Sequence, residues 1–324
     1  MVLTNEQLRA TLRGALEVKE ENGHVAPYRF GAHLRENVYG VGNQFHGAMS
    51  HTSGVVSTFR TNSELLSFSW ELTEASPDQS FDVWAGGIFL SHTVTSTLTG
   101  RTEVELPAGD KTVTIYYPYR RAGRIFDVTL DDGADFAAAD APACRILFLG
   151  DSITHGSSTA FSSMTYAHQI ARELDAEIVN QGIGGEGFNP HAVDMDMPFD
   201  PDLISVSYGT NDWSHNPSHA HFVGVVNGHL AALRDRYPST PIAMILPIWR
   251  ADYTLTTKKV GSFEEARRVL IEAAARFGAT VIDGFSLVPH LRSVMEDDRL
   301  HPNEFGFQFY AENLLPYFKE ILAK

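Results

Sequence analysis

Polar and apolar residues alternate along much of the chain between about Tyr28 and Asp132. In the run KTVTIYYP, for example, Val113 and Ile115 fall on one face and the intervening threonines on the other. A period of two with one apolar face is typical of half-buried antiparallel strands. We expect these strands to pack as a β-sandwich or jelly roll.

The expected strands are the runs GVVSTFRT, LLSFSWEL, FDVWAGGIFLSHTV, RTEVELPAG, KTVTIYYP and RIFDVTLDD. The segment LPAGDK has turn chemistry and predicts a hairpin between the two runs that flank it. Before the strands, Leu8, Leu12 and Leu16 recur every four residues in LTNEQLRATLRGALEVKE. That spacing predicts an initial helix or arm.

A different pattern follows Cys144. The apolar runs RILFLG, AEIVNQGI, DLISVSYG, PIAMILPIW and ATVIDG are short and nearly continuous, which is typical of strands buried on both faces. Segments of helical period lie between them; Tyr166, Ile170 and Leu174 share one face, and the last such segment contains Pro316, which we expect to kink or interrupt it. Repeated alternation of strand and helix indicates a parallel sheet with helices on both faces.

The length and the change of pattern together predict two domains. A chain of 324 residues is long for one core. The alanine- and aspartate-rich stretch DDGADFAAADAPA has no large apolar residue after its phenylalanine and marks the expected boundary. We therefore assign residues 1–140 to an all-β domain with an initial helix or arm, and residues 141–324 to an α/β domain.

Charge narrows the classes of partner. Forty acidic residues against 25 basic ones give a net charge of -15, which disfavours binding to nucleic acid or to an anionic membrane surface. No apolar run is long enough to span a bilayer, the N-terminus does not have the pattern of a signal peptide, and Cys144 is the single cysteine. We expect a cytoplasmic protein, with secretion of a processed form and a homo-oligomeric state left open.

Four polar clusters stand where the predicted strands of the parallel sheet end or just before the last helix. They are GDS at 150–152, NQGIGG at 180–185, GTND at 209–212 and DRLH at 298–301. Ligands of such sheets bind at the carboxyl ends of the strands. Each cluster alone has a simpler interpretation as a turn, a loop or a helix cap. Their joint occurrence along one edge favours a catalytic site.

The clusters supply every group that acyl transfer requires. Ser152 could act as nucleophile, His301 as its base and Asp298 as the group that orients the imidazole. The backbone N–H groups of Ser152 and Gly185 and the side-chain amide of Asn211 could stabilise the oxyanion. The sequence thus predicts a serine nucleophile with a complete triad.

The order of these clusters resembles that of the SGNH, or GDSL-type, hydrolase superfamily from about Arg145 to the C-terminus. The resemblance implies a three-layer α/β/α, flavodoxin-like domain, a metal-free hydrolase activity on esters, and the roles given above for Ser152, Gly185, Asn211, Asp298 and His301. Gly185 is preferred to the other glycines of its loop because it stands five residues after the asparagine, as in the family block. A β-sandwich before such a domain is similar to the family-2 carbohydrate esterases, which remove acetyl groups from sugars. Some of those esterases lack the aspartate that this chain has.

We therefore expect a serine esterase that hydrolyses short-chain acyl esters, with acetyl esters of carbohydrates favoured. The loops after the strands are mostly small or polar, which favours a short acyl group over the long chain of a lipase or thioesterase, the first alternative. The second alternative is a catalytically inert sugar-binding protein. A metal enzyme is disfavoured, because His215, His219 and His221 in HNPSHAH lack the glutamate of a zincin motif. We expect no metal and no cofactor.

Four further residues are candidates for the substrate pocket, whose ligand would be a small-molecule or oligosaccharide ester. Trp213 follows the GTND cluster, and Trp249 and Arg250 follow the fourth strand of the predicted parallel sheet. His155 lies in GDSITHG, and it would either line the acyl pocket or be exposed to solvent; we expect exposure.

Overall fold

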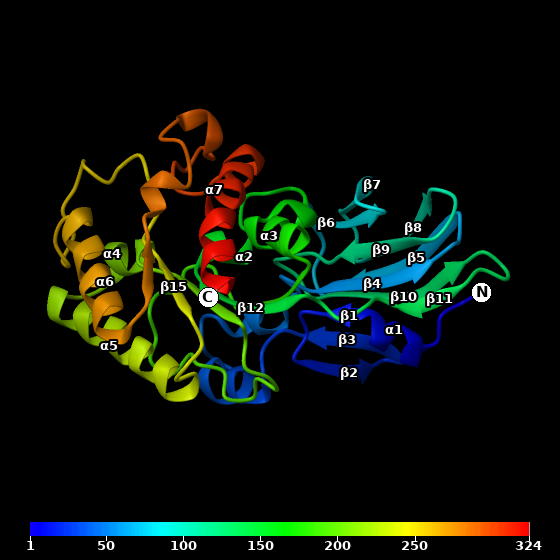
Figure 1. Ribbon diagram of the computed structural model, residues 1–324, viewed down its shortest axis with the longest axis horizontal. Coiled ribbons are helices and arrows are strands. Elements are labelled where there is room, and N and C mark those ends of the chain that lie inside the picture. The colour runs from blue at the N-terminus through cyan, green and yellow to red at the C-terminus, as the bar shows by residue number, and fades with distance from the viewer. Residues whose placement is uncertain (324) are drawn as a thin grey trace.

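The alternating stretch folds into antiparallel strands, and the stretch after Cys144 folds into a parallel sheet with helices. The computed structural model describes residues 1–323, so Lys324, the last residue of the predicted second domain, lies outside the described residues. Figure 1 shows the β region on the right and the α/β region on the left, with β12 leading from one to the other. Both architectures agree with the prediction.

The β region holds two antiparallel sheets and a hairpin. Its elements are α1 (Asn5–Thr11), β1 (Leu12–Arg13), β2 (Glu17–Glu21), β3 (His24–Tyr28), β4 (Val56–Thr61), β5 (Leu65–Leu72), β6 (Ser76–Ala85), β7 (Ile88–Thr95), β8 (Thr99–Glu105), β9 (Lys111–Tyr116), β10 (Gly123–Leu130) and β11 (Phe136–Ala138). One sheet has the order β1-β4-β9-β6-β7 with β11 also pairing with β4, the other has the order β10-β5-β8, and β2 pairs with β3. Side chains of both sheets, among them Phe59 and Phe68, form one buried cluster. The β region is therefore a sandwich.

Two predictions about connections in the β region were wrong. The segment LPAGDK does not form a hairpin, because β8 pairs with β5 in one sheet and β9 lies between β4 and β6 in the other. The run FDVWAGGIFLSHTV is two strands, β6 and β7, joined by Gly86 and Gly87, whose φ angles of 58° and 80° suit a tight turn. Pairing partners depend on contacts between distant segments, which a local period does not encode.

The initial helix is shorter than its leucine spacing predicts. Helix α1 ends at Thr11, and Leu12 begins strand β1. Gly14 then has a φ of 78°, and a Cβ at this position would lie 2.3 Å from the carbonyl oxygen of Gly54. This close approach of two backbones turns the chain into β2 in place of a longer helix.

The α/β region has one five-stranded parallel sheet in the order β13-β12-β14-β15-β16. Its strands are β12 (Cys144–Gly150), β13 (Ala176–Asn180), β14 (Leu203–Ser207), β15 (Ile242–Ile245) and β16 (Thr280–Ile282). Its α-helices are α2 (Ser152–His155), α3 (Tyr166–Leu174), α4 (Thr210–His215), α5 (His219–Arg236), α6 (Phe263–Phe277) and α7 (Glu304–Leu322), with 3-10 turns at Ser162–Met164, Gly284–Ser286 and Arg292–Val294. This strand order is the flavodoxin-like one.

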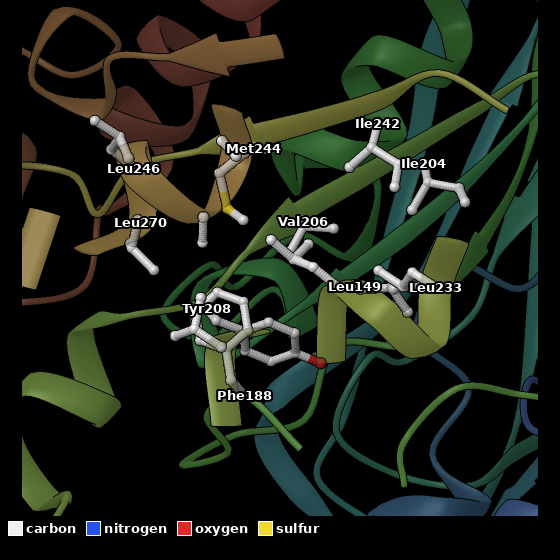
Figure 2. Close-up of a cluster of buried hydrophobic side chains, with 14 of the residues drawn as sticks. Leu149, Phe188, Ile204, Val206, Tyr208, Leu233, Ile242, Met244, Leu246 and Leu270 are labelled. Carbon is white, nitrogen blue, oxygen red and sulfur yellow. The ribbon is translucent and has the colours of Figure 1, made fainter. Parts of the chain in front are cut away.

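Alternate residues of strand β12, which lies between β13 and β14, point to opposite helical layers. Leu147 and Leu149 belong to the buried cluster that α5 and α6 cover, and Figure 2 shows this cluster over β14 and β15. Ile146 and Phe148 belong to the cluster on the other face, under α3 and α7. Burial of each such side chain stabilises the fold by about 1.5–3 kcal/mol. The nearly continuous apolar run of this strand is thus explained by helices on both faces.

Pro316 does not interrupt the last helix. Helix α7 runs from Glu304 to Leu322 with Pro316 inside it. Leu314 and Phe318, on either side of the proline, are fully buried against the sheet. Burial of this apolar face outweighs the loss of one backbone hydrogen bond. No helix in the described part of the chain is long and apolar enough to cross a membrane.

Residues 29–52, which we call the strap, contain no strand and leave the β region to pack on the α/β region. The strap contains a π-helical turn at Leu34–Val38 and a 3-10 turn at His46–Ser50. Its apolar side chains Phe30, Leu34, Tyr39 and Met49 are buried together with Ile183 and Ala192 of the α/β region. The prediction of strands from about Tyr28 onward was therefore wrong for this segment.

A buried carboxyl group lies under the strap. The Tyr39 hydroxyl donates a hydrogen bond to Oε1 of Glu186, and Oε2 of Glu186 is buried without a partner among the described residues. Burial raises the pKa of Glu186 to about 8, and the carboxylate of Asp212 acts in the same direction. Glu186 therefore keeps its proton in the folded chain at pH values where the unfolded chain loses it.

This difference predicts how Glu186→Gln changes stability with pH. The raised pKa of Glu186 stabilises the fold fully below its unfolded value near 4.5, and that stabilisation is lost as the pH rises through about 8. Gln does not titrate, so the Tm of the variant minus that of the wild type should increase by several degrees from pH 5 to pH 8, measured by thermal unfolding. The control is Glu20→Gln on the exposed surface of β2, whose difference from wild type should stay flat. A flat difference for Glu186→Gln as well would contradict the prediction.

Candidate active site

Ser152 stands at the first position of α2, two residues after strand β12 ends at Gly150. Asp151 caps this helix, because its Oδ1 accepts a hydrogen bond of 3.0 Å from the backbone N–H of Ile153. Gly150 allows the sharp turn, since a Cβ there would lie 2.1 Å from Oγ1 of Thr154. The strand end and the cap together fix the Ser152 side chain at the carboxyl edge of the sheet, near the junction of the two regions (Figure 1).

The structure brings Ser152, His301 and Asp298 into one line of hydrogen bonds. The Oγ of Ser152 lies 2.6 Å from Nε2 of His301, and Nδ1 of the same ring is hydrogen-bonded to Oδ2 of Asp298. A proton on Nδ1 is required for that second bond, so Nε2 is the acceptor for the serine hydroxyl. This is the arrangement of a nucleophile, its base and the group that orients the base.

The loop before α7 holds the aspartate and the histidine in register. The backbone N–H groups of Leu300 and His301 both donate to Oδ1 of Asp298, at 2.9 and 3.0 Å. Arg299, between them, has a φ of 60°, which few residues with a side chain adopt. The carbonyl of His301 accepts a hydrogen bond of 2.8 Å from the N–H of Glu296, which closes the loop.

The carboxyl group of Asp298 is ionised in this setting. Partial burial alone would raise its pKa, but hydrogen bonds from the backbone and the ring of His301 and from the N–H of Leu300 outweigh burial and lower it. A negative charge at Asp298 favours a positive charge on the imidazole beside it. The pair can therefore accept a proton from Ser152 and hold it.

The glycine loop after β13 leaves one backbone donor without a partner. The N–H of Gln181 donates to Phe148, that of Gly182 to the Asn180 side chain, that of Ile183 to Gly150, that of Gly184 to His155 and that of Glu186 to Ile183. Among the described residues, the N–H of Gly185 has no acceptor. Gly185 has a φ of 87°, a conformation that favours glycine.

The Asn211 side chain is held next to this loop. Its Nδ2 donates a hydrogen bond of 2.9 Å to the carbonyl of Glu186, which leaves one further amide proton. Gly209, with a φ of 121°, turns the chain from β14 into α4, and a Cβ there would lie 2.8 Å from Pro247. The amide of Asn211 and the free N–H of Gly185 thus belong to neighbouring segments at the same edge of the sheet.

Three residues predicted to line the pocket are placed elsewhere. Trp213 is fully buried, and its Nε1 donates to the carbonyl of Gly261, so it is part of the core under α6. Arg250 is buried over the Trp213 ring and donates to the Thr210 side chain, which anchors α4. His155 is only 2% exposed, which contradicts the expectation of exposure. Apolar neighbours and internal hydrogen bonds keep all three side chains from solvent.

Trp249 remains at a pocket. It is half-buried, its ring stacks on His290 at 5.4 Å, and it lines a cavity of about 200 Å³ with Met295 and Arg299 of the loop before His301. A larger cavity of about 590 Å³ lies between the two regions and is lined by Arg120, Arg121, Glu296 and Glu304, among others.

The sequence reasoning missed the strap residues that lie behind the glycine loop. Arg29 is fully buried and donates to the carbonyls of Asn180 and Gly182 at 2.6 and 2.8 Å. Nδ1 of His51 lies 3.3 Å from Nε2 of His155. The strap carries no period and no known motif, so no signal in the sequence points to these contacts.

The histidine-rich segment HNPSHAH does not form a metal cluster in the described chain. Nδ1 of His219 is hydrogen-bonded to the carbonyl of Val260 at 3.0 Å. Among the residues that the structure describes, no group of three or more His, Cys, Asp or Glu side chains is placed to hold a metal ion.

Comparison with known proteins identifies the family. A search of curated proteins gave no match. Similar solved structures include the salicylyl-acyltransferase SsfX3 from a tetracycline biosynthetic pathway, with a TM-score of 0.83 and 22% identity over 96% of this chain and 94% of that one. A family two carbohydrate esterase from Cellvibrio japonicus has a TM-score of 0.70 and 17% identity over 100% and 98% of the two chains. One from Clostridium thermocellum, in complex with cellohexaose, has 0.66 and 17% over 84% and 94%. The TM-scores show that these proteins share the fold of this chain, and the low sequence identities show nothing beyond the fold.

The sequence itself carries the assignment, because residues 148–309 match the GDSL-like Lipase/Acylhydrolase family. That segment spans half of the chain and includes Ser152, Asn211, Asp298 and His301. The chain belongs to the GDSL-like lipase/acylhydrolase family.

Proposed function

We propose that this protein is a serine esterase that hydrolyses short-chain acyl esters, with acetyl esters of carbohydrates as its substrates. The observation that carries the proposal is the continuous line from Ser152 Oγ through the His301 ring to Asp298, with 2.6 Å between Oγ and Nε2. Membership in a family of acylhydrolases agrees with this chemistry.

In the first step, Oγ of Ser152 attacks the ester carbonyl carbon while its proton passes to Nε2 of His301. The carbonyl oxygen becomes an oxyanion, for which the N–H groups of Ser152 and Gly185 and the amide of Asn211 are the donors. Gly185 is favoured over its neighbours because the N–H groups of Gly184 and Glu186 already have acceptors, in His155 and Ile183. When the bond to the alcohol breaks, Nε2 of His301 returns the proton to the departing oxygen.

In the second step, water replaces the alcohol. His301 removes a proton from the water, the hydroxide attacks the acyl carbon, and the bond to Ser152 Oγ breaks as Oγ recovers the proton. The free acid leaves and the enzyme is restored. An alcohol in place of water would yield a new ester through the same intermediate, so the product must be identified as well as the rate.

Two cavities border the loop that ends at His301 and leave space for a polar alcohol near the site. The cavity of about 200 Å³ beside Trp249 reaches this loop through Met295 and Arg299. The cavity of about 590 Å³ adjoins the histidine loop through Glu296 and presents carboxylate and guanidinium groups, which are suitable partners for sugar hydroxyls.

We also propose that the two regions are separate domains divided between residues 140 and 141. Strand β11 ends at Ala138 and pairs with β4 of the sandwich, whereas β12 begins at Cys144 in the parallel sheet. The strap is one part of the first domain that packs on the second.

A chain-length series of nitrophenyl esters, with acetylated mono- and oligosaccharides, tests the proposed function. We expect kcat/KM to be highest for acetyl and to fall with each added pair of carbons, and the acid to be the product. Ser152→Ala should lower kcat at least about 10⁴-fold, because no oxygen remains to form the acyl-enzyme. The matched control is Ser163→Ala, since Oγ of Ser163 is buried without a hydrogen-bond partner among the described residues. Preference for eight carbons or more, or an active Ser152→Ala, would refute the proposal.

Asn211→Ala should remove one oxyanion donor. We expect kcat to fall about 10²- to 10³-fold with KM changed little, because the developing charge exists only in the transition state. Asn216→Ala, on the same segment, removes an amide that donates to Asp212 at 3.0 Å and serves as the control for effects on α4. Equal losses in both variants would show that the defect is structural.

Asp298→Asn should preserve the conformation of the loop before α7 and remove the negative charge beside His301. The amide oxygen can still accept from the N–H groups of Leu300 and His301, so the fold should be retained. We expect kcat to fall roughly 10³- to 10⁴-fold at about pH 8, where the lowered pKa of Asp298 keeps the wild-type carboxyl group ionised. Asp297→Asn, at the exposed neighbour, is the control. A loss below tenfold would mean that His301 works without the aspartate.

A further inference from the structure

His155 lies directly behind the glycine loop of the site. It is three residues after Ser152 on α2, and its Nδ1 lies 3.2 Å from the backbone nitrogen of Gly184. A peptide N–H can only donate, so Nδ1 is the acceptor and the single proton of the neutral ring is on Nε2. A Cβ built on Gly184 would lie 3.8 Å from Nδ1 of His155 and 3.8 Å from Cβ of Ser152, so this residue sits between the two side chains.

The surroundings of His155 keep its ring neutral. Burial lowers the pKa of His155 well below its usual value, and the charge of Arg29 and the nearby His51 and Arg120 act in the same direction. A doubly protonated ring would have no acceptor for the N–H of Gly184. The hydrogen bond from Gly184 to His155 is therefore available at neutral pH.

Groups from the first domain fix the other side of the ring. Nε2 of His155 lies 3.3 Å from Nδ1 of His51, which can accept its proton. Nη2 of Arg29 lies 3.4 Å from the same Nε2, but both nitrogens are donors in this tautomer and no hydrogen bond joins them. The hydroxyl of Ser53 donates a hydrogen bond of 2.8 Å to the carbonyl of His155. His155 is thus held on the side away from the glycine loop by His51 of the strap and by Ser53, the residue after the strap.

Arg29 ties the same strap to the glycine loop itself. Its guanidinium donates to the carbonyls of Asn180 and Gly182 in the loop and to those of Ala48 and His51 in the strap. The loop is therefore fixed at its start by Arg29 and at Gly184 by His155.

We propose that His155 is a positioning residue for the oxyanion hole: its Nδ1 accepts from the N–H of Gly184 and so fixes the next peptide, which presents the N–H of Gly185 to the substrate. His51 of the strap holds the imidazole in place, and Arg29 fixes the start of the glycine loop. This inference rests on the proposed esterase function and adds to it a role for the first domain. Gly184 and Gly185 are flexible, and a misplacement of about 1 Å at a reacting site can lower the rate about 10²-fold.

The test compares His155→Leu with His155→Asn on nitrophenyl acetate. Leu fills much of the space but has no acceptor, whereas Oδ1 of Asn can take the place of Nδ1. We expect kcat to fall about 10²-fold for His155→Leu with KM within about threefold of wild type, and to fall less than about tenfold for His155→Asn. Both variants are assayed well below their own Tm, so that a loss of stability does not enter the rate.

The control is His168→Leu, which removes another buried histidine outside the site. His168 is also 2% exposed, and its Nδ1 is hydrogen-bonded to the carbonyl of Ser162 at 2.8 Å. Its replacement should lower Tm and leave kcat unchanged. Equal kcat for His155→Leu and wild type, equal losses for the Leu and Asn variants, or a rise in KM in place of a fall in kcat would each overturn the role of His155. A wild type that does not hydrolyse acetyl esters would instead refute the proposed function.

Discussion

The pairing of β12 with β13 on one side and with β14 on the other is the constraint on which the site depends. Parallel pairing places the carboxyl ends of the three strands at one edge, and the residues just beyond them are Ser152, the glycine loop and Asn211. The register is fixed because each face of β12 is buried against a different helical layer. A slip by one residue would exchange the two faces and move the serine away from the histidine loop.

The second constraint is the burial of the Arg29 guanidinium between the strap and the glycine loop. A buried charge is costly unless hydrogen bonds replace its water, and four carbonyl groups do so here. Burial lowers the pKa of Arg29 to about 9, so the charge persists at neutral pH. Because the carbonyls come from both regions, the guanidinium is satisfied only when the strap is docked. The docking of the first domain and the shape of the loop are therefore formed together.

The strands could be predicted from the sequence, because each depends on a local pattern of apolar and polar residues. Period and composition located all five strands of the parallel sheet and most strands of the sandwich, since burial on one or two faces leaves a direct record in the residues. The predicted nucleophile and base, Ser152 and His301, are 149 residues apart in the chain, and their side chains lie 2.6 Å from each other in the structure. Ser152 could be placed from the sequence because its motif follows a predicted strand of the sheet.

What the sequence did not predict depends on long-range packing. The burial of His155 requires the strap, which has no period, and the burial of Trp213 requires α6 and Gly261. A tryptophan beside a catalytic motif looks the same in sequence whether it faces a substrate or a core. Arg29 of the strap contacts the glycine loop by donating to backbone carbonyls, which any sequence supplies, so the sequence of the loop gives no sign of this contact.

Burial also determines the charge of the carboxyl groups that lie near the site. The chain carries a net charge of -15, and three buried carboxyl groups, Asp151, Glu186 and Asp212, lie around the glycine loop and the helix that bears Asn211. Burial raises their pKa values to about 7, 8 and 6, and Asp212 raises those of the other two. Negative charge at these positions would oppose an oxyanion that develops nearby. Burial thus keeps Glu186 largely protonated at neutral pH and so lessens the negative charge near the proposed oxyanion donors.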